Sequence, residues 1–406
     1  MNVLWMKSDY PLPLDSGSKK RTYNLLKHTR AAFNTTYLGT VHDRRLLTRP
    51  SLDGLVDKEI TIFRERERRE GFSFYLRLLA NVGSSVPYFV KSQTYRELRD
   101  KRRKIFRDQA IDLVICDSLA VAGNVDFSLP VPKVFMAYGI ETDLWQQRYD
   151  TAHGLIRRAY FNYETKRIAA YESSSCNRFD LVVAVSERDK RHLEEDLKVR
   201  VPIEVIETGL DCRFFSPIPE ITRIPKRLVF TGSGDMLSNI DGLLWFAAEA
   251  LPVIRKAHPD VTLDIIGPDP ASEIRALGRK DDAIRVTGWV DDVRPYLAAA
   301  DVFIVPLRVP GGTRVKVYEA MGMKTPVVST GHGIEGLAVA DGVHCLIGET
   351  PRDMAASIIE LFDDAEKKQT IADNAHRFIN ENYDWSVMAE KLIGICKGIA
   401  AKPNAG

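Results

Sequence analysis

The chain has 406 residues, of which 45% are apolar and 28% charged, and its formal net charge is +2. This composition is typical of a folded soluble protein and excludes a disordered chain, while the balanced charge excludes binding to polyanions through overall charge. No apolar run reaches the roughly 18 residues of a membrane span, and the first residues lack the basic segment of a secretory signal. Five scattered cysteines without a Cys-x-x-Cys pair argue against a disulfide framework or a zinc knuckle. We therefore expect a cytoplasmic enzyme or binding protein of two domains.

The first half of the chain alternates short apolar runs with longer helical stretches. Strands are expected at residues 2–6, 35–38, 113–116, 133–136, 181–185 and 203–206, and helical stretches at 18–31, 92–110 and 153–177. This alternation predicts an α/β fold in which parallel sheets are covered on both faces.

The second half repeats the alternation after a proline-rich segment. Pro217, Pro219 and Pro225 exclude a helix or a central strand there, so we expect a linker. Strands are expected at residues 228–232, 262–267, 284–288, 302–306 and 326–329, an amphipathic helix at 240–257 and helices from about 351 to 400. The expected divisions are an N-terminal domain at 1–216, a linker at 217–226, a C-terminal domain at 227–385 and a final helix at 386–406 that packs back on the N-terminal domain.

The segment 306–322 carries the strongest chemical signal. It follows a strand, contains Gly311, Gly312 and Thr313, and then reads as a helix that begins with Arg314 and Lys316. Glycines and free amides at a helix start attract phosphate. Cations there oppose the helix dipole by about 0.3–1 kcal/mol each, which a bound anion would offset. The other interpretation is a tight turn with two solvated basic residues.

This segment resembles the signature of the family 4 retaining glycosyltransferases, which have the GT-B fold. That fold has two facing Rossmann-like domains with the active site in the cleft between them. Glu319 matches the second of the two signature glutamates, which in the family holds the donor ribose, and Gly311 stands at the first. The chain resembles the branch with Gly-Gly-Thr-Arg-x-Lys-x-x-Glu in that place. The resemblance implies that Arg314 and Lys316 hold the donor diphosphate, together with Gly311, Gly312 and Thr313.

Other stretches extend the resemblance over nearly the whole chain. The loop that contains Gly234 resembles the first loop of the donor domain, and Gly17 lies in the corresponding loop of the first domain. The resemblance places recognition of the base on the backbone near Val290. The side chain of the neighbouring Trp289 either stacks on the base or packs against the protein, and we favour packing. His332 falls in a loop that faces the cleft in the family, although a lone histidine is more often an ordinary loop residue.

The stretch 136–145 should also face the cleft. Relatives carry a His, then an Asn, then a Glu two residues on; here the matching residues are Tyr138, Gly139 and Glu141. Either Tyr138 replaces the histidine as a hydrogen-bond partner of the sugar, or the alignment shifts by a residue or two, or the protein is inactive. The catalytic set that the resemblance implies is Arg314, Lys316, Glu141 and Tyr138.

Residues 64–107 hold 13 Lys/Arg against five acidic residues, a local charge of +8. Aromatic residues lie between them. This combination suits an anionic membrane surface, a lipid-diphosphate or an acidic glycan. The alternative is a solvated helical face with pairs such as Glu97 and Lys101. Nucleic acid is disfavoured because no nucleic-acid-binding motif accompanies the charge.

The resemblance implies a retaining hexosyltransferase that uses a nucleotide-diphosphate sugar, with a glycan or a lipid-linked acceptor. It suggests cell-envelope or exopolysaccharide synthesis at the inner face of the membrane, without a metal or other cofactor. A catalytically inactive nucleotide-sugar or glycan-binding partner of the same fold is the alternative. A nicotinamide oxidoreductase is disfavoured, since no Gly-x-Gly-x-x-Gly follows an expected strand. The base, the sugar, the acceptor and the oligomeric state stay open.

Overall fold

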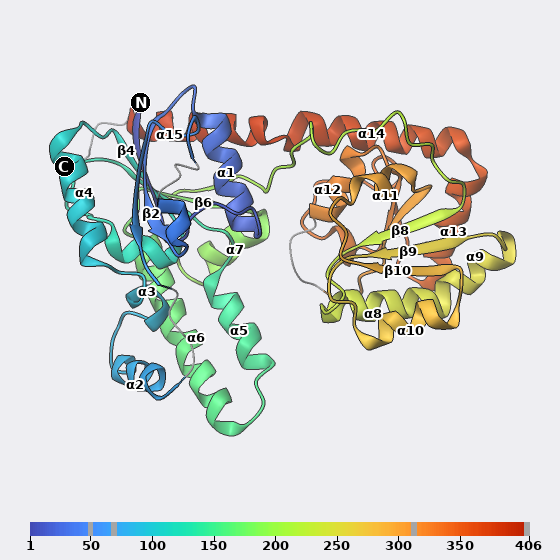
Figure 1. The fold of residues 1–406 in the computed structure, drawn as a ribbon, viewed down its shortest axis with the longest axis horizontal. Helices are drawn as coiled ribbons and strands as arrows, with labels where there is room; N and C mark the ends of the chain where they lie inside the picture. The colour runs from blue at the N-terminus through green and yellow to red at the C-terminus, as the bar shows by residue number, and fades with distance from the viewer. Residues whose placement is uncertain (48–51, 66–70, 310–314, 402–406) are drawn as a thin grey trace. The chain divides into compact units, whose positions relative to one another are not determined.

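The chain forms two compact units in a computed structural model that describes residues 1–47, 52–65, 71–309 and 315–401 (Figure 1). Unit 1 comprises Met1–Thr208 and the segment from Met388 onward, and unit 2 comprises Gly209–Val387. Each unit is built on one parallel sheet, so each has the layered helix–sheet–helix organisation that the alternating sequence predicts.

Unit 1 contains a seven-stranded sheet in the order β3-β2-β1-β4-β5-β6-β7, with every neighbouring pair parallel. The strands are β1 (Asn2–Lys7), β2 (Asn34–Val41), β3 (Lys58–Phe63), β4 (Leu113–Asp117), β5 (Lys133–Met136), β6 (Leu181–Ala184) and β7 (Ile203–Val205). The helices are α1 (Gly17–Thr29), α2 (Phe72–Asn81), α3 (Tyr88–Lys91), α4 (Arg96–Asp108), α5 (Glu141–Asp150), α6 (Leu155–Cys176), α7 (Glu187–Glu195) and α15 (Trp385–Ala400), with short 3-10 turns at Arg44–Leu47 and Leu119–Asn124.

The central strand β1 shows how the sequence divides between the two faces of this sheet. Leu4 and Met6 belong to the main hydrophobic core of unit 1. Trp5 and Lys7 alternate with them and therefore point to the opposite face, since successive strand residues face opposite ways. Both are almost fully buried, because helices cover this face too.

Unit 2 contains a six-stranded parallel sheet in the order β10-β9-β8-β11-β12-β13. The strands are β8 (Arg227–Thr231), β9 (Thr262–Ile266), β10 (Ile284–Gly288), β11 (Val302–Val305), β12 (Val327–Ser329) and β13 (Leu346–Ile347). The helices are α8 (Leu237–Trp245), a π-helical turn at Phe246–Ala250, α9 (Leu251–Ala257), α10 (Ser272–Lys280), α11 (Arg294–Ala299), α12 (Val315–Gly322), α13 (Pro351–Asp363) and α14 (Ala365–Tyr383), with a 3-10 turn at His332–Ile334.

Two hydrophobic cores lie on the two faces of the unit 2 sheet. Along β11, Val302 and Ile304 join one core while Phe303 and Val305 join the other. A strand that is apolar at every position is what a parallel sheet buried on both faces requires. The short apolar runs of the second half are therefore the central strands of this unit.

The expected strands and helices are largely present, with differences at the edges. The strand β3 was not expected, because Lys58 and Glu59 mask its apolar residues. The expected helix at 240–257 begins earlier, at Leu237, and contains the π-helical turn. The expected helical stretch at 351–400 is three helices, since Asp364 caps α14 and Asp384 separates it from α15.

The proline-rich segment expected as a linker packs within unit 2. The backbone N–H of Ile224 donates to Ala299 at 2.9 Å, and Arg223 donates to the Lys324 carbonyl at 2.8 Å. The final helix α15 joins unit 1 from Met388 onward, where Lys391 donates to Glu207 at 3.1 Å.

The helical run Leu237–Ala257 is long and apolar enough to cross a membrane by length and composition alone. Core helices of globular proteins meet the same criterion. Leu243, Phe246, Leu251 and Ile254 of this run lie in the core of unit 2, so the run has the contacts of a core helix.

Candidate functional site

Both sheets reverse their strand order at one point. The reversal falls between β1 and β4 in unit 1 and between β8 and β11 in unit 2. In open parallel sheets, ligands bind outside the carboxyl ends of the strands at such a reversal, because the following loops diverge there. These two places are therefore the candidate sites, and each is described within its own unit.

Glycines shape the site in unit 2. Gly232 follows β8, and its N–H donates to Ile266 at 2.9 Å. Gly267 follows β9, and a Cβ added there would lie 1.9 Å from the Gly232 carbonyl oxygen. A Cβ on Gly234 would lie 2.5 Å from the Pro270 Cα. The two loops thus pack backbone against backbone, which only glycine permits.

Lys316 places its ammonium group against this glycine turn. The residue stands in the first turn of α12, and its Nζ lies 3.2 Å from Asn239 Oδ1 and 4.1 Å from the centre of the Phe230 ring. A Cβ on Gly232 would lie 2.7 Å from the same Nζ. Asn239 is fixed in turn by a 2.7 Å hydrogen bond to the Ser233 carbonyl. The result is a cation held at the start of a helix, beside a loop without side-chain bulk, where a phosphate would fit.

The other residues expected in this unit occupy different surroundings. Glu319 is half-buried on α12, one turn after Lys316, and Val290 is half-buried after β10. His332 is exposed at its 3-10 turn. Trp289 is 72% exposed, so the favoured interpretation of this side chain as a packing residue is wrong. Gly311, Gly312, Thr313 and Arg314 lie outside the described residues.

The site in unit 1 is a buried polar cluster at the ends of β1 and β4. Lys7 and Asp117 are register partners, and Lys7 Nζ lies 3.5 Å from Asp117 Oδ2. Trp5 Nε1 donates to the same oxygen at 2.8 Å, and the Thr22 hydroxyl lies 2.7 Å from it. The Tyr138 hydroxyl donates to Asp117 Oδ1. One carboxylate therefore organises the cluster from a fully buried position.

Tyr138 is held on several sides. Its hydroxyl lies 2.6 Å from the Thr22 hydroxyl and 3.2 Å from Lys7 Nζ, which also lies 4.4 Å from the ring centre. Burial, with Asp117 beside it, raises the pKa of Tyr138 well above its ordinary value. Burial lowers the pKa of Lys7, and Asp117 opposes that shift. The phenol is thus a neutral hydrogen-bonding group whose position is fixed.

Arg21 of α1 lies next to this cluster. Its Cζ is 5.4 Å from the centre of the Tyr138 ring, and its guanidinium donates to Ile206 at 2.8 Å and to Ala137 at 3.3 Å. The side chain is 1% exposed, and its Nε has no hydrogen-bond partner. Burial lowers its pKa. Gly17 begins the same helix, which Ser16 caps by accepting from Lys19.

Glu141 begins α5, where a second carboxylate takes over the capping role. Glu172 of α6 accepts from the backbone N–H groups of Glu141 and Thr142, both at 2.9 Å, and from the Thr142 hydroxyl at 2.7 Å. Burial and the neighbouring Glu172 raise the pKa of Glu141 to about 7. Glu141 thus has the acidity of a group that exchanges a proton near neutral pH.

Several of these residues escaped the sequence interpretation: Lys7, Asp117, Thr22 and Glu172. A signal existed for two of them, because Lys7 and Asp117 directly follow expected strands and so stand where parallel strands end. Thr22 and Glu172 lie inside helices and gave no local signal. Tyr138 joins the Asp117 cluster in unit 1, and Lys316 joins the glycine loop in unit 2.

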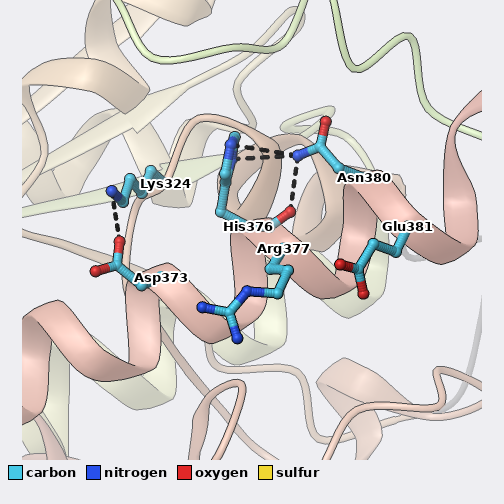
Figure 2. A pocket seen from close by; sticks show the side chains of 6 residues that line it. All are labelled: Lys324, Asp373, His376, Arg377, Asn380 and Glu381. Carbon is cyan, nitrogen blue, oxygen red and sulfur yellow. Dashed lines mark hydrogen bonds and ion pairs between the residues drawn. The ribbon is translucent and has the colours of Figure 1, made fainter.

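A surface pocket lies elsewhere on unit 2, along α14 (Figure 2). Lys324 and Asp373 form an ion pair at 2.5 Å there, and His376 Nδ1 donates to the Gly322 carbonyl at 2.8 Å. Lys324 precedes β12, so this pocket lies at the amino ends of the strands, opposite the glycine loop. Among the described residues, no group of three or more His, Cys, Asp or Glu is placed to hold a metal ion.

Two family models match the chain. The model described as Glycosyltransferase Family 4 matches residues 17–214, and the model described as Glycosyl transferases group 1 matches residues 225–364. Together they span most of both units. The chain belongs to the family 4 glycosyltransferases. The resemblance noted in the sequence is therefore confirmed at the level of the family.

The sequence identity between this chain and individual curated relatives is low. An uncharacterized 44.6 kDa protein in the cps region of Klebsiella pneumoniae is 25% identical over 315 residues, which cover 74% of this chain and 76% of that protein. A phosphatidyl-myo-inositol mannosyltransferase of Mycobacterium tuberculosis is 28% identical over 54% of this chain and 59% of its own length. The chain thus spans little more than half of this mannosyltransferase.

Solved structures with the same fold cover nearly the whole chain. Anabaena HepE, crystallised with UDP and glucose, has a TM-score of 0.62 and 16% identity over 98% of this chain and 99% of its own. Sucrose-phosphate synthase from Thermosynechococcus elongatus has a TM-score of 0.68 and 15% identity over 99% of both chains. This likeness confirms the expected α/β fold of the GT-B class.

Proposed function

We propose that this glycosyltransferase moves a sugar from a nucleotide-diphosphate donor to a glycan or a lipid-linked acceptor, with retention of the anomeric configuration. It would act as a hexosyltransferase in cell-envelope or exopolysaccharide synthesis, in the cytoplasm or at the inner face of the membrane. The mannosyltransferase among the relatives and the UDP complexes of HepE support a donor and an acceptor of these classes.

One observation carries the proposal. The Lys316 ammonium stands at the start of α12, 3.2 Å from Asn239 Oδ1, beside a glycine turn at the strand reversal of unit 2. As the bond between sugar and phosphate breaks, negative charge grows on the diphosphate. A fixed cation and helix amides stabilise such charge by a few kcal/mol each. We assign this role to Lys316, with Arg314 and the amides of 311–313 completing the set, and propose that no metal is needed.

Unit 1 supplies the remaining groups in this proposal. Glu141, with its pKa near 7, is the carboxyl that exchanges a proton with the acceptor hydroxyl or the sugar. Tyr138 is a fixed hydrogen-bonding group at the strand reversal. Attack from the face that the diphosphate leaves requires no enzyme nucleophile, and the configuration is retained.

A catalytically inactive donor-binding protein is the second candidate. The observation that favours it is the Tyr138 hydroxyl, which already has Asp117, Thr22 and Lys7 as partners inside unit 1. A phenol committed in this way has less hydrogen-bonding capacity left for a sugar than a histidine would have.

Calorimetric titration of UDP, GDP, ADP and dTDP into the parent and Lys316→Ala tests the donor site. We expect one diphosphate to bind, and the substitution to weaken it at least tenfold, about 1.4 kcal/mol. Lys367→Ala is the matched control, because Lys367 pairs with Glu360 on another surface of the same unit. Equal affinity of the parent and Lys316→Ala, or no binding by any of the four, contradicts the proposal.

Turnover separates the two candidates. The parent is incubated with the sugar form of whichever diphosphate binds, and release of free diphosphate is followed over hours. A transferase hydrolyses its donor slowly without acceptor, and Glu141→Gln slows that release. Tight binding with no release under any condition identifies the inactive alternative.

A further inference from the structure

Among the described residues, several of the most exposed apolar side chains lie on two helices of unit 1. On α2, Phe72, Leu76 and Leu79 are 79%, 48% and 69% exposed. Their spacing of four and then three residues places them on one face of the helix. At the start of α6, Leu155 and Ile156 are 88% and 87% exposed. These five residues are named the apolar tip.

The helices that carry the apolar tip are held to each other. Arg167 of α6 donates to the Asn81 carbonyl at 3.0 Å, and the Tyr163 hydroxyl donates to the Val82 carbonyl. The end of α2 is thus fixed beside the middle of α6. In Figure 1, α2 and the turn between α5 and α6 extend away from the sheet of unit 1 in the same direction. The exposed residues therefore lie on two helices that are bonded to each other and protrude from the sheet of unit 1 in the same direction.

The net charge around the apolar tip is positive. Residues 71–95 and 144–166 contain six Lys/Arg and two acidic residues, a net charge of +4. One of the two acids, Glu164, is buried. Arg157 and Arg158, directly after the apolar pair of α6, are exposed, as are Arg148 and Lys91. Apolar side chains flanked by exposed arginines suit the boundary between lipid headgroups and acyl chains.

We propose that the apolar tip inserts into the surface of an anionic lipid bilayer and so docks the protein on the membrane. The charge selects this occupant over a second copy of the chain, because two copies paired through this surface would bring like charges together, whereas anionic headgroups attract them. The proposal places membrane contact at α2 and the start of α6 rather than on the basic face of α4. On α4, Arg102 is buried and bonded to Asn124 and Asp126, and Glu97 pairs with Arg64, which follows β3.

Vesicle flotation of the full chain tests the proposal. With phosphatidylcholine vesicles that contain phosphatidylglycerol, we expect the parent protein to float with the vesicles at low salt. With pure phosphatidylcholine vesicles, we expect the parent protein to remain at the bottom of the gradient. The variant Phe72→Ser/Leu155→Ser/Ile156→Ser should lower the bound fraction at least roughly tenfold. Leu237→Ser is the matched control, because Leu237 is 77% exposed on α8 of unit 2. Equal flotation of the triple variant and the parent, or no flotation of the parent, overturns the proposal.

Insertion itself has a direct readout. The five native cysteines are all buried, so Ile156→Cys offers a thiol-reactive, polarity-sensitive dye an accessible site. We expect its emission to shift to the blue with anionic vesicles, and that of a dye on Leu237→Cys to stay unchanged. No shift at position 156 overturns insertion.

Light scattering and nucleoside diphosphate titration separate membrane binding from dimer formation and from donor binding. If light scattering shows a dimer of the parent that the triple variant loses, the surface binds a second copy and the proposal fails. The proposal does not depend on donor binding: nucleoside diphosphate titration of the triple variant should match the parent. If the triple variant loses flotation but still binds the nucleoside diphosphate, the apolar tip acts in membrane binding alone. If the parent floats but binds no nucleoside diphosphate, the proposed function fails and the membrane proposal stands.

Discussion

The buried polar side chains at the ends of β1 and β4 in unit 1 have Asp117 as their common partner. Its carboxylate, which is not solvent-exposed, faces the Lys7 ammonium and accepts from Trp5 and Tyr138. A buried charge destabilises the folded state when its partners are removed, because the protein interior solvates a lone ion poorly. The cluster is therefore as much a structural device as a candidate site.

Asp117→Ala should lower the free energy of unfolding by about 3–5 kcal/mol, because it leaves Lys7 charged and unpaired and removes the acceptor of Trp5. Urea denaturation measures the change. Asp260→Ala is the control, since Asp260 pairs with Lys226 on the surface of unit 2, and we expect an unchanged midpoint. If the urea midpoint of Asp117→Ala shifts as little as that of the Asp260→Ala control, Asp117 does not have this structural role.

Glu141 gives unit 1 a dependence on pH. Its pKa is about 7 in the folded chain and 4.5 ordinarily, so the folded state holds this proton more tightly and loses stability as pH rises between those values. Glu141→Gln removes that loss. The stability of the variant relative to the parent should therefore rise by about 3 kcal/mol between pH 4.5 and pH 8. Urea denaturation at both pH values checks it, and a difference independent of pH would show that the carboxyl titrates normally.

At the scale of elements, helix starts show what local sequence determines. Ser186 caps α7 by accepting from the backbone N–H of Asp189 at 3.0 Å, a cap that needs only neighbouring residues. The start of α5 has no such side chain of its own. Its cap, Glu172, comes from another helix 31 residues after Glu141, which no local pattern reveals.

Glu172→Ala should therefore loosen α5. We expect faster amide hydrogen exchange at Glu141 and Thr142 and a loss of about 1–3 kcal/mol of stability, since two backbone donors lose their acceptor. Thr350→Ala, which removes the capping box of α13 in unit 2, is the matched variant. It should cost about 1 kcal/mol and leave exchange in α5 unchanged. Unchanged exchange in α5 of Glu172→Ala would contradict the assigned cap.

The same contrast explains how far the sequence predicts the site. Gly311, Gly312, Lys316 and Glu319 lie in one segment with a recognisable order, and the strand that leads to them is a continuous apolar run. The partners Asn239 and Asp117 come from segments distant in sequence, so only the folded sheet brings them to Lys316 and Tyr138. The strand β3 escaped because an edge strand with polar residues lacks the apolar run of a central one.

At the scale of the molecule, the two units have separate cores, so damage should stay local. Leu392 of α15 and Leu361 of α13 are both fully buried, the first in unit 1 and the second in unit 2. Substitution of either by Ala should cost about 2–5 kcal/mol. Hydrogen exchange should accelerate in the sheet of unit 1 for Leu392→Ala and in the sheet of unit 2 for Leu361→Ala. Acceleration of both sheets by either variant would show that the cores unfold as one.

The place of α15 also sets an order of events during synthesis. The ribosome makes Met1–Thr208 first, yet unit 1 lacks Met388, Leu392 and Cys396 until α15 has been made. Unit 2 has all its residues once Val387 has been added. The half translated second is thus complete in sequence before the half translated first. A released chain cut short at residue 387 would carry a finished unit 2 and a unit 1 with an open apolar surface, which chaperones and proteases recognise.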